Sequence, residues 1–259
     1  MEEKIFLWPG EAPYAEQSPG QAAPSLTAFL APGARGAVVV IPGGGYVMKA
    51  DHEGVPIARM LQAAGISGYV LDYRVYPCHW EAPLSDAKRA VRLLRGMGYE
   101  KVGVLGFSAG GNLCCAVATL YDEGDPASPD PVERLSSRPD AFIPCYAVAS
   151  FGPFTHAGSR DSLLGERKDD PALIRRFSAE ENVTADTPPA FIWHTAEDGL
   201  VPCQNSLDLA RALADHHVPF ELRVYEKGHH GLGLAAENGA AAGWSGEVCR
   251  WLLERGYGK

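Results

Sequence analysis

VGVLGFSAGGNLCCAVA, residues 102–118, is the stretch that decides the fold. Its first part is an apolar run typical of a buried strand, and its last part is typical of a helix. Between them lies Gly106-Phe107-Ser108-Ala109-Gly110, a G-x-S-x-G pattern. In a strand–turn–helix context this pattern predicts a nucleophile elbow, a tight turn that presents the Ser108 hydroxyl. A glycine-rich turn with an incidental serine is the alternative interpretation.

The rest of the chain alternates apolar, β-branched runs with helical patterns. Strands are predicted at 37–41, 67–73, 101–106, 141–146, 190–195 and 220–225, the fourth weakened by its proline. Helices are predicted at 56–64, 84–94, 109–121, 204–216 and 244–253, the second capped by Ser85 or Asp86. Short antiparallel edge strands are predicted at 5–8 and 26–30. The fold class is therefore α/β, with a mostly parallel central sheet and helices on both faces.

Two stretches break this alternation. Residues 122–139 are rich in Pro, Ser and Asp and predict a surface loop. Residues 150–189, with a short helix at about 171–177, are long for a connection between strands. We therefore expect one domain over 1–259 with a small cap-like insertion at about 150–189. Such an insertion often covers a binding site, but a mobile surface excursion is an equal alternative.

Composition and charge exclude several classes of protein. With 46% hydrophobic and 21% charged residues among 259, the chain can bury a large core. The net charge of −9 and the lack of a basic stripe argue against a nucleic-acid partner. No apolar run reaches the roughly 18 residues of a membrane span, and the acidic N-terminus does not resemble a signal peptide. Six cysteines without a C-x-x-C pair indicate a reducing, cytoplasmic location.

A serine nucleophile needs a base, and the base needs a carboxylate that orients it. In open α/β sheets such groups gather beyond the carboxyl ends of strands. Asp198 follows the fifth predicted strand of the main series and is the expected acid, with Glu197 as the neighbour that could be confused with it. After the sixth of these strands, His230 precedes a glycine and is the expected base, with His229 as the fallback. An Asp that only shapes a turn, and two exposed loop histidines, are the alternative interpretations.

A glycine run follows the first strand of this series, in Pro42-Gly43-Gly44-Gly45-Tyr46. The N–H groups of Gly44, Gly45 and Ala109 are the expected donors of an oxyanion hole. A phosphate-binding loop is disfavoured because the Lys-Ser/Thr of a P-loop is missing, and no zinc-binding spacing is present. We therefore expect no metal and no cofactor.

Taken together, these motifs resemble the acetyl-xylan-esterase-like α/β-hydrolases, which are related to hormone-sensitive-lipase-type and feruloyl/acetyl esterases. The resemblance implies an α/β-hydrolase fold and a metal-independent serine hydrolase of carboxylic esters, with acetyl groups on sugars as the commonest substrate. Beside Ser108, Asp198 and His230–Leu232, the matching stretches are 7–10, 42–46, 53–54, 72–75, 83–86, 90–92, 106–111 and 188–195. Pro42 stands where lipases and esterases have the His of H-G-G-G.

The sequence indicates the substrate less clearly than the reaction. A polar sugar ester needs stacking and hydrogen-bonding groups, for which Tyr46, His79, Trp80 and His156 are candidates, although ordinary packing is the favoured interpretation of each one taken singly. The expected partner is a small-molecule or oligosaccharide ester, and a homo-oligomer is left open. A general short-chain esterase, an amidase or formamidase, or a peptidase are alternatives on the same fold. A non-catalytic binding protein is the alternative of another class.

Overall fold

Apolar runs whose residues are buried on both faces form the centre of one sheet. In the computed structural model, which describes residues 3–259, the sheet has eight strands in the order β1-β2-β4-β3-β5-β6-β7-β8. The strands are β1 (Glu3–Phe6), β2 (Ser25–Phe29), β3 (Gly36–Ile41), β4 (Ser67–Asp72), β5 (Lys101–Phe107), β6 (Ala141–Cys145), β7 (Ala190–Thr195) and β8 (Phe220–Tyr225). β2 pairs antiparallel with both β1 and β4, and the remaining neighbours, from β4 through β3 and β5 to β8, pair parallel.

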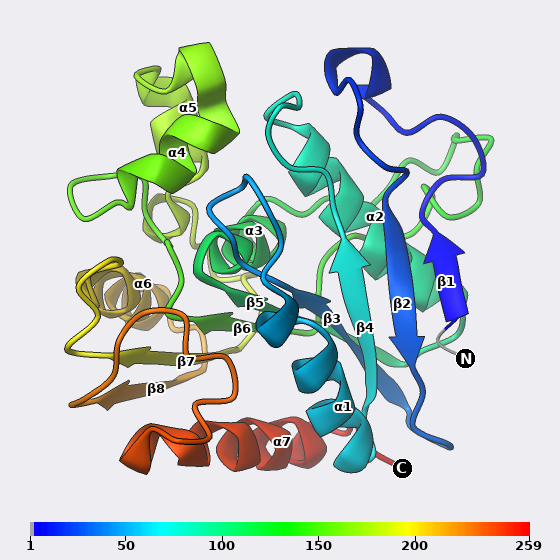
Figure 1. Ribbon diagram of the computed structural model, residues 1–259. Helices are drawn as coiled ribbons and strands as arrows, with labels where there is room; N and C mark the ends of the chain where they lie inside the picture. Colours follow the sequence, from blue (N-terminus) through cyan, green and yellow to red (C-terminus); the bar gives the residue numbers. More distant parts are fainter. Residues whose placement is uncertain (1–2) are drawn as a thin grey trace.

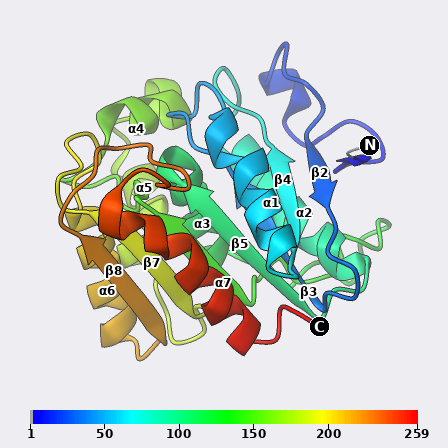
Figure 2. The ribbon, with the colours of Figure 1, turned by 60° about the horizontal axis from the view of Figure 1, so that its bottom comes forward.

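Helices cover both faces of this sheet (Figures 1 and 2). α1 (Val55–Ala63) and α7 (Trp244–Glu254) pack on one face, and their apolar residues share a core cluster with Val38, Val40 and Trp193. α2 (Ala82–Gly96), α3 (Ser108–Thr119) and α6 (Gln204–Asp215) pack on the other face. α3 is buried nearly all round, which is why its sequence lacks a polar stripe.

These observations confirm the predicted fold class, with a mostly parallel sheet between two layers of helices. Pro144 lies inside β6, opposite Gly106 of β5. On the other side of β6, the residues that pair with β7 are Phe142 and Cys145, which flank the proline in the sequence. This placement is consistent with the missing N–H of proline.

The predicted cap of α2 is wrong. The helix begins at Ala82, three residues earlier than Ser85, with Pro83 in its first turn. Asp86 lies inside the helix and is fully buried, where it accepts hydrogen bonds from Arg74 at 2.9 and 2.7 Å. Asp86 therefore neutralises a buried guanidinium instead of capping a helix.

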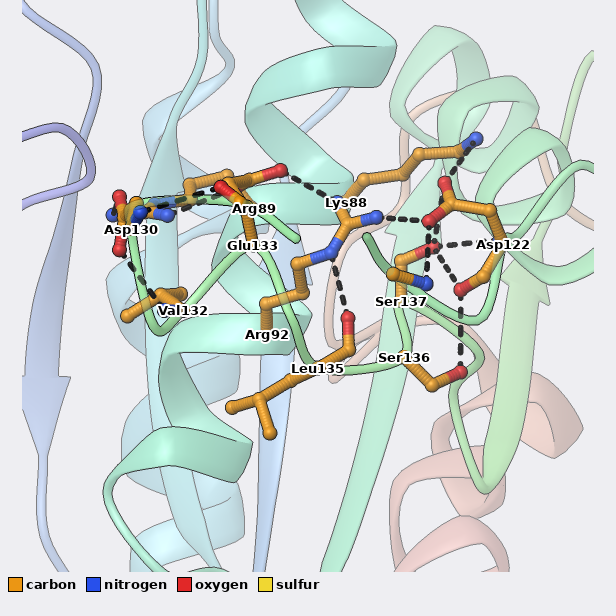
Figure 3. A network of polar contacts seen from close by, with 12 residues as sticks. Lys88, Arg89, Arg92, Asp122, Asp130, Val132, Glu133, Leu135, Ser136 and Ser137 are labelled. Atoms are coloured by element: carbon orange, nitrogen blue, oxygen red, sulfur yellow. Dashed lines mark hydrogen bonds and ion pairs between the residues drawn. The ribbon is translucent and has the colours of Figure 1, made fainter. Parts of the chain in front are cut away.

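Residues 120–140 contain no helix or strand, as expected for a surface loop, but ion pairs hold this loop against α2. Figure 3 shows Arg89 reaching Asp130 and Glu133, at 2.7 and 2.8 Å, while Arg92 pairs with Asp122. Because both guanidinium groups are nearly buried, we infer that these pairs contribute more than exposed ion pairs do.

The segment between β6 and β7 is mostly irregular but holds two helices, which lie together in Figure 1. α5 (Pro171–Arg176) matches the predicted helix, whereas α4 (Ala157–Leu164) has no clear apolar periodicity and was not predicted. Short 3-10 turns complete the chain at Ala15–Gln17, Asp51–Glu53, Gly165–Arg167, Ala179–Glu181 and Gly239–Gly243. In residues 3–259 no helix has the length and apolar character needed to cross a bilayer.

Candidate active site

Ser108 stands at the sharp turn between β5 and α3. Its φ of 52° lies in the left-handed region, a strained conformation for a residue with a side chain. The two flanking glycines make the turn possible. A Cβ on Gly106 would lie 2.2 Å from the Gly110 carbonyl oxygen, and a Cβ on Gly110 would lie 2.3 Å from the Ile41 carbonyl oxygen. The G-x-S-x-G pattern therefore reflects a close approach of β3, β5 and α3.

A chain of hydrogen bonds joins three predicted residues that are far apart in the sequence. His230 Nε2 lies 2.8 Å from Ser108 Oγ, and His230 Nδ1 lies 2.7 Å from Asp198 Oδ2. A neutral imidazole satisfies both contacts when Nδ1–H donates to the carboxylate and Nε2 accepts from the hydroxyl. This tautomer is the one that can take the serine proton.

The surroundings of Asp198 keep it ionised. Its Oδ1 accepts the N–H groups of Leu200 and Val201 at 3.0 and 2.9 Å. Burial raises the pKa of the Asp198 carboxyl, but hydrogen bonds from His194, His230 and Val201 outweigh burial and hold the pKa well below its ordinary value. A depressed carboxyl pKa stabilises the folded state above the ordinary pKa, and this contribution is lost only as the pH falls through the folded value.

The geometry also distinguishes each predicted residue from its neighbour. Glu197 is exposed, whereas Asp198 is buried and aimed at the histidine. His229 is exposed and its Nδ1 lies 2.7 Å from the His230 carbonyl oxygen, so it does not contact Ser108. Asp198 and His230 are therefore the pair that the structure brings to the elbow.

The glycine loop after β3 offers free donors. In the described part of the chain, neither Gly44 N–H nor Gly45 N–H donates to a protein acceptor. Gly43 N–H is different, because it donates to the Glu53 carboxylate at 2.8 Å. Ala109 N–H lies in the first turn of α3, where no intrahelical acceptor is available. Of this set, Gly44, Gly45 and Ala109 are therefore suited to hold a developing negative charge.

Tyr46 does not lie at the mouth of the site. Its side chain is 1% exposed, and its hydroxyl donates to Asn112 Oδ1 at 2.8 Å. This burial contradicts the prediction that the ring contacts a sugar. The residue has a φ of 60°, which turns the chain after the glycine run and directs the ring inward, against Tyr73.

His79 and Trp80 form a half-buried aromatic cluster at the start of α2. The His79 ring stacks on Tyr14 at 4.5 Å, and the guanidinium groups of Arg167 and Arg176 lie 5.4 and 5.9 Å from the centre of the Trp80 ring. These partners occupy much of both rings, so packing explains their position without a ligand.

His156 is electrostatically coupled to the hydrogen-bonded chain. It caps α4, and its Nδ1 accepts the Ser159 N–H at 3.2 Å. Burial lowers the pKa of His156, the charge of His230 lowers it further, and Asp198 raises it. Of the four residues predicted to contact a sugar, His156 is therefore the one whose pKa responds to the charges of His230 and Asp198.

Three polar residues near the site received no role in the sequence analysis. His194 is fully buried in β7, and its Nε2 lies 2.9 Å from the Val201 carbonyl oxygen and 3.4 Å from Asp198 Oδ2. Glu53 and Tyr146 are also buried and bonded to each other. The sequence does show a histidine inside an apolar strand, His194, and an acid shortly after the glycine run, Glu53. Neither feature shows which residue the side chain contacts.

Metal ligands were not expected. In the described chain, 3–259, no group of three or more His, Cys, Asp or Glu side chains has an arrangement that could hold a metal ion.

A serine at a strand–helix elbow, with its acid and base following later strands of a mostly parallel sheet, defines the α/β-hydrolase fold. Residues 31–213 match the family model BD-FAE, and the chain belongs to this family. It is 40% identical, with a TM-score of 0.92, to the crystal structure of an acetyl ester-xyloside bifunctional hydrolase from Caldicellulosiruptor lactoaceticus, over 100% of this chain and 98% of that one.

Two further relatives cover this chain only as part of a larger protein. The endo-1,4-beta-xylanase B of Butyrivibrio fibrisolvens is 39% identical over 82% of this chain and 34% of its own length. The acetylxylan esterase of Xylanibacter ruminicola is 32% identical over 76% of this chain and 41% of its own length. The chain thus spans less than half the length of these curated relatives.

Proposed function

We propose that this chain is a serine ester hydrolase that removes acetyl and other short acyl groups from acetylated xylo-oligosaccharides or related sugars. The observation that carries the reaction class is the chain of hydrogen bonds from Asp198 through His230 to Ser108. Free N–H groups on the adjacent glycine loop support the same proposal, because acyl transfer develops charge on the carbonyl oxygen.

The reaction follows from this arrangement. His230 Nε2 removes the proton of Ser108 Oγ as the oxygen attacks the ester carbonyl carbon. The tetrahedral oxyanion accepts hydrogen bonds from Gly44, Gly45 and Ala109. Its collapse breaks the bond to the alcohol oxygen, which takes the proton from His230, and leaves an acyl-enzyme. Water then attacks the acyl carbon and gives a proton to His230. The second tetrahedral intermediate collapses by breaking the bond to Ser108 Oγ, which takes this proton back from His230, and the acid is released.

The names of the relatives support the substrate class. Both a curated acetylxylan esterase and the solved acetyl ester-xyloside hydrolase resemble this chain, and the resemblance to the solved hydrolase covers 100% of this chain. Of the four side chains predicted to contact a sugar, His156 is the candidate that is left, because Tyr46 is buried and packing accounts for His79 and Trp80. Nucleic acid and membrane are not proposed as partners.

Acetate release tests the substrate. We expect the purified protein to release acetate from acetylated xylo-oligosaccharides with a higher kcat/KM than from p-nitrophenyl acetate, and to turn over p-nitrophenyl butyrate more slowly than the acetate. A protein that cleaves only the activated esters would still be an esterase, but the sugar-ester proposal would be wrong. A protein that cleaves none of them would favour the non-catalytic alternative.

A further inference from the structure

Glu53 is a buried carboxylate directly beneath the glycine loop. It ends the short 3-10 turn Asp51–Glu53 and is 2% exposed. Its Oε2 accepts the Gly43 N–H at 2.8 Å, and a Cβ on Gly43 would lie 2.7 Å from that oxygen and 2.9 Å from the Ser108 Cβ. The carboxylate therefore sits against the glycine loop, close behind the nucleophile.

The second oxygen of Glu53 leads to the loop that carries His230. Tyr146, the residue after β6, donates its hydroxyl to Glu53 Oε1 at 2.7 Å and accepts the Gly233 N–H at 2.8 Å. Its ring packs edge-on against the His230 ring, with centroids 5.1 Å apart. Burial and the Glu53 carboxylate raise the pKa of Tyr146 well above its ordinary value, so the hydroxyl keeps its proton and remains a donor.

A second contact joins the Asp51–Glu53 turn to the loop that carries His230. His52, the neighbour of Glu53, has its Nε2 2.9 Å from the Gly231 carbonyl oxygen. The turn thus contacts the loop that carries His230 through His52 and, by way of Tyr146, through Glu53, which also binds Gly43 of the glycine loop. His52 and Gly231 are 179 positions apart in the sequence, so local chain geometry does not set the distance between them.

The direction of these bonds matters for the oxyanion donors. Because Gly43 N–H donates to Glu53, the peptide between Pro42 and Gly43 is held in one orientation and this N–H is not available to a substrate. The following N–H groups, of Gly44 and Gly45, remain without a protein acceptor. Burying a carboxylate is unfavourable unless it is well bonded, and here the bonds go to the loops of the site.

We propose that Glu53 is a positioning residue for the hydrolysis. Through Gly43 N–H and the Tyr146 hydroxyl, its carboxylate holds the oxyanion donors and the His230 loop in register with Ser108, without contacting the substrate. The inference rests on the serine-hydrolase function proposed above. It assigns a role to two residues, Glu53 and Tyr146, that do not belong to the triad.

Two conservative variants test this role. In Glu53→Gln only one oxygen can accept, and the amide NH₂ must face either Gly43 N–H or a displaced Tyr146 hydroxyl. In Tyr146→Phe the ring that packs on His230 stays, but Glu53 Oε1 and Gly233 N–H lose their partner. We expect each variant to lower kcat on p-nitrophenyl acetate about 10- to 100-fold, less than the loss of a direct oxyanion donor, with KM within about threefold of wild type. Combining the variants should cost much less than the product of the two effects, since both break one connection.

Asp51→Asn is the matched control, because Asp51 lies exposed on the same 3-10 turn. It should leave kcat and the melting temperature unchanged. All rates are taken per folded site, titrated with a fluorophosphonate. Should Glu53→Gln fail to fold, Tyr146→Phe alone gives the kcat and KM readout.

The outcomes separate the two proposals. A kcat within twofold of wild type in the folded variants, or multiplicative effects in the double variant, would overturn the role of Glu53 and leave the hydrolase function intact. Ser108→Ala is run in the same assay with its concentration taken from absorbance, because it lacks the hydroxyl that the fluorophosphonate labels, and retained activity there would overturn the hydrolase mechanism itself. A larger KM with an unchanged kcat would also contradict the positioning role, since that pattern indicates lost ground-state binding.

Discussion

Ser108→Ala is expected to lower kcat for ester hydrolysis by about 10⁵- to 10⁶-fold, to the level left by binding and oxyanion stabilisation. In the proposed mechanism the oxygen of this hydroxyl becomes bonded to the acyl group, and its hydrogen bond to His230 Nε2 at 2.8 Å gives its proton an acceptor. Steady-state rates on p-nitrophenyl acetate measure the effect.

The fold should survive this change. Alanine removes only the Oγ atom from a turn whose shape is set by Gly106 and Gly110, so the melting temperature is expected to stay close to that of wild type. Activity within tenfold of wild type in a correctly folded Ser108→Ala protein would contradict the assignment of the nucleophile.

Asp198→Asn is expected to lower kcat about 10⁴-fold, because it reverses the tautomer of the base. Oδ1 of the new side chain can keep the Leu200 and Val201 N–H bonds, which places the amide NH₂ where Oδ2 faced His230. That NH₂ must donate to Nδ1, so the imidazole proton moves to Nε2 and faces Ser108. A protonated Nε2 cannot accept the serine proton. Burst and steady-state kinetics at neutral pH would measure the loss.

The neighbouring carboxylate provides the control. Glu197→Gln removes an exposed charge next to Asp198, and we expect its kcat to remain within twofold of wild type. If Glu197→Gln were the slow variant and Asp198→Asn the active one, the acid would be misassigned. His229→Ala serves the same purpose beside His230 and should retain activity.

Much of the fold could be predicted because its strands are buried on both faces. Runs such as Val38-Val39-Val40-Ile41 are apolar throughout, and their alternation with amphipathic helices leaves few arrangements other than a parallel sheet. The beginning of α2 could not be predicted, because Asp86 looks like a capping residue until the buried Arg74 that it neutralises is known. α4 was missed because its sequence has no apolar face.

The chain Ser108–His230–Asp198 could be anticipated because each residue lies one to five positions after the end of a parallel strand, and the carboxyl ends of these strands face the same edge. The roles of Tyr46, Glu53 and His194 could not. Whether a tyrosine after a glycine run points outward or inward depends on one backbone angle, and at Tyr46 a φ of 60° turns it inward to Asn112. Glu53 contacts Tyr146, which is distant in the sequence, and His194 contacts Val201 across a loop, and no local pattern encodes either contact.

Covalent labelling of the nucleophile tests the central claim most directly. The wild-type protein is incubated with a fluorophosphonate, digested, and the labelled peptide is sequenced by mass spectrometry. A single label on Ser108, formed as esterase activity disappears and absent in Ser108→Ala, is the result that the proposed mechanism predicts. A label on another residue that accompanies the loss of activity, or full activity with Ser108 labelled, would contradict it.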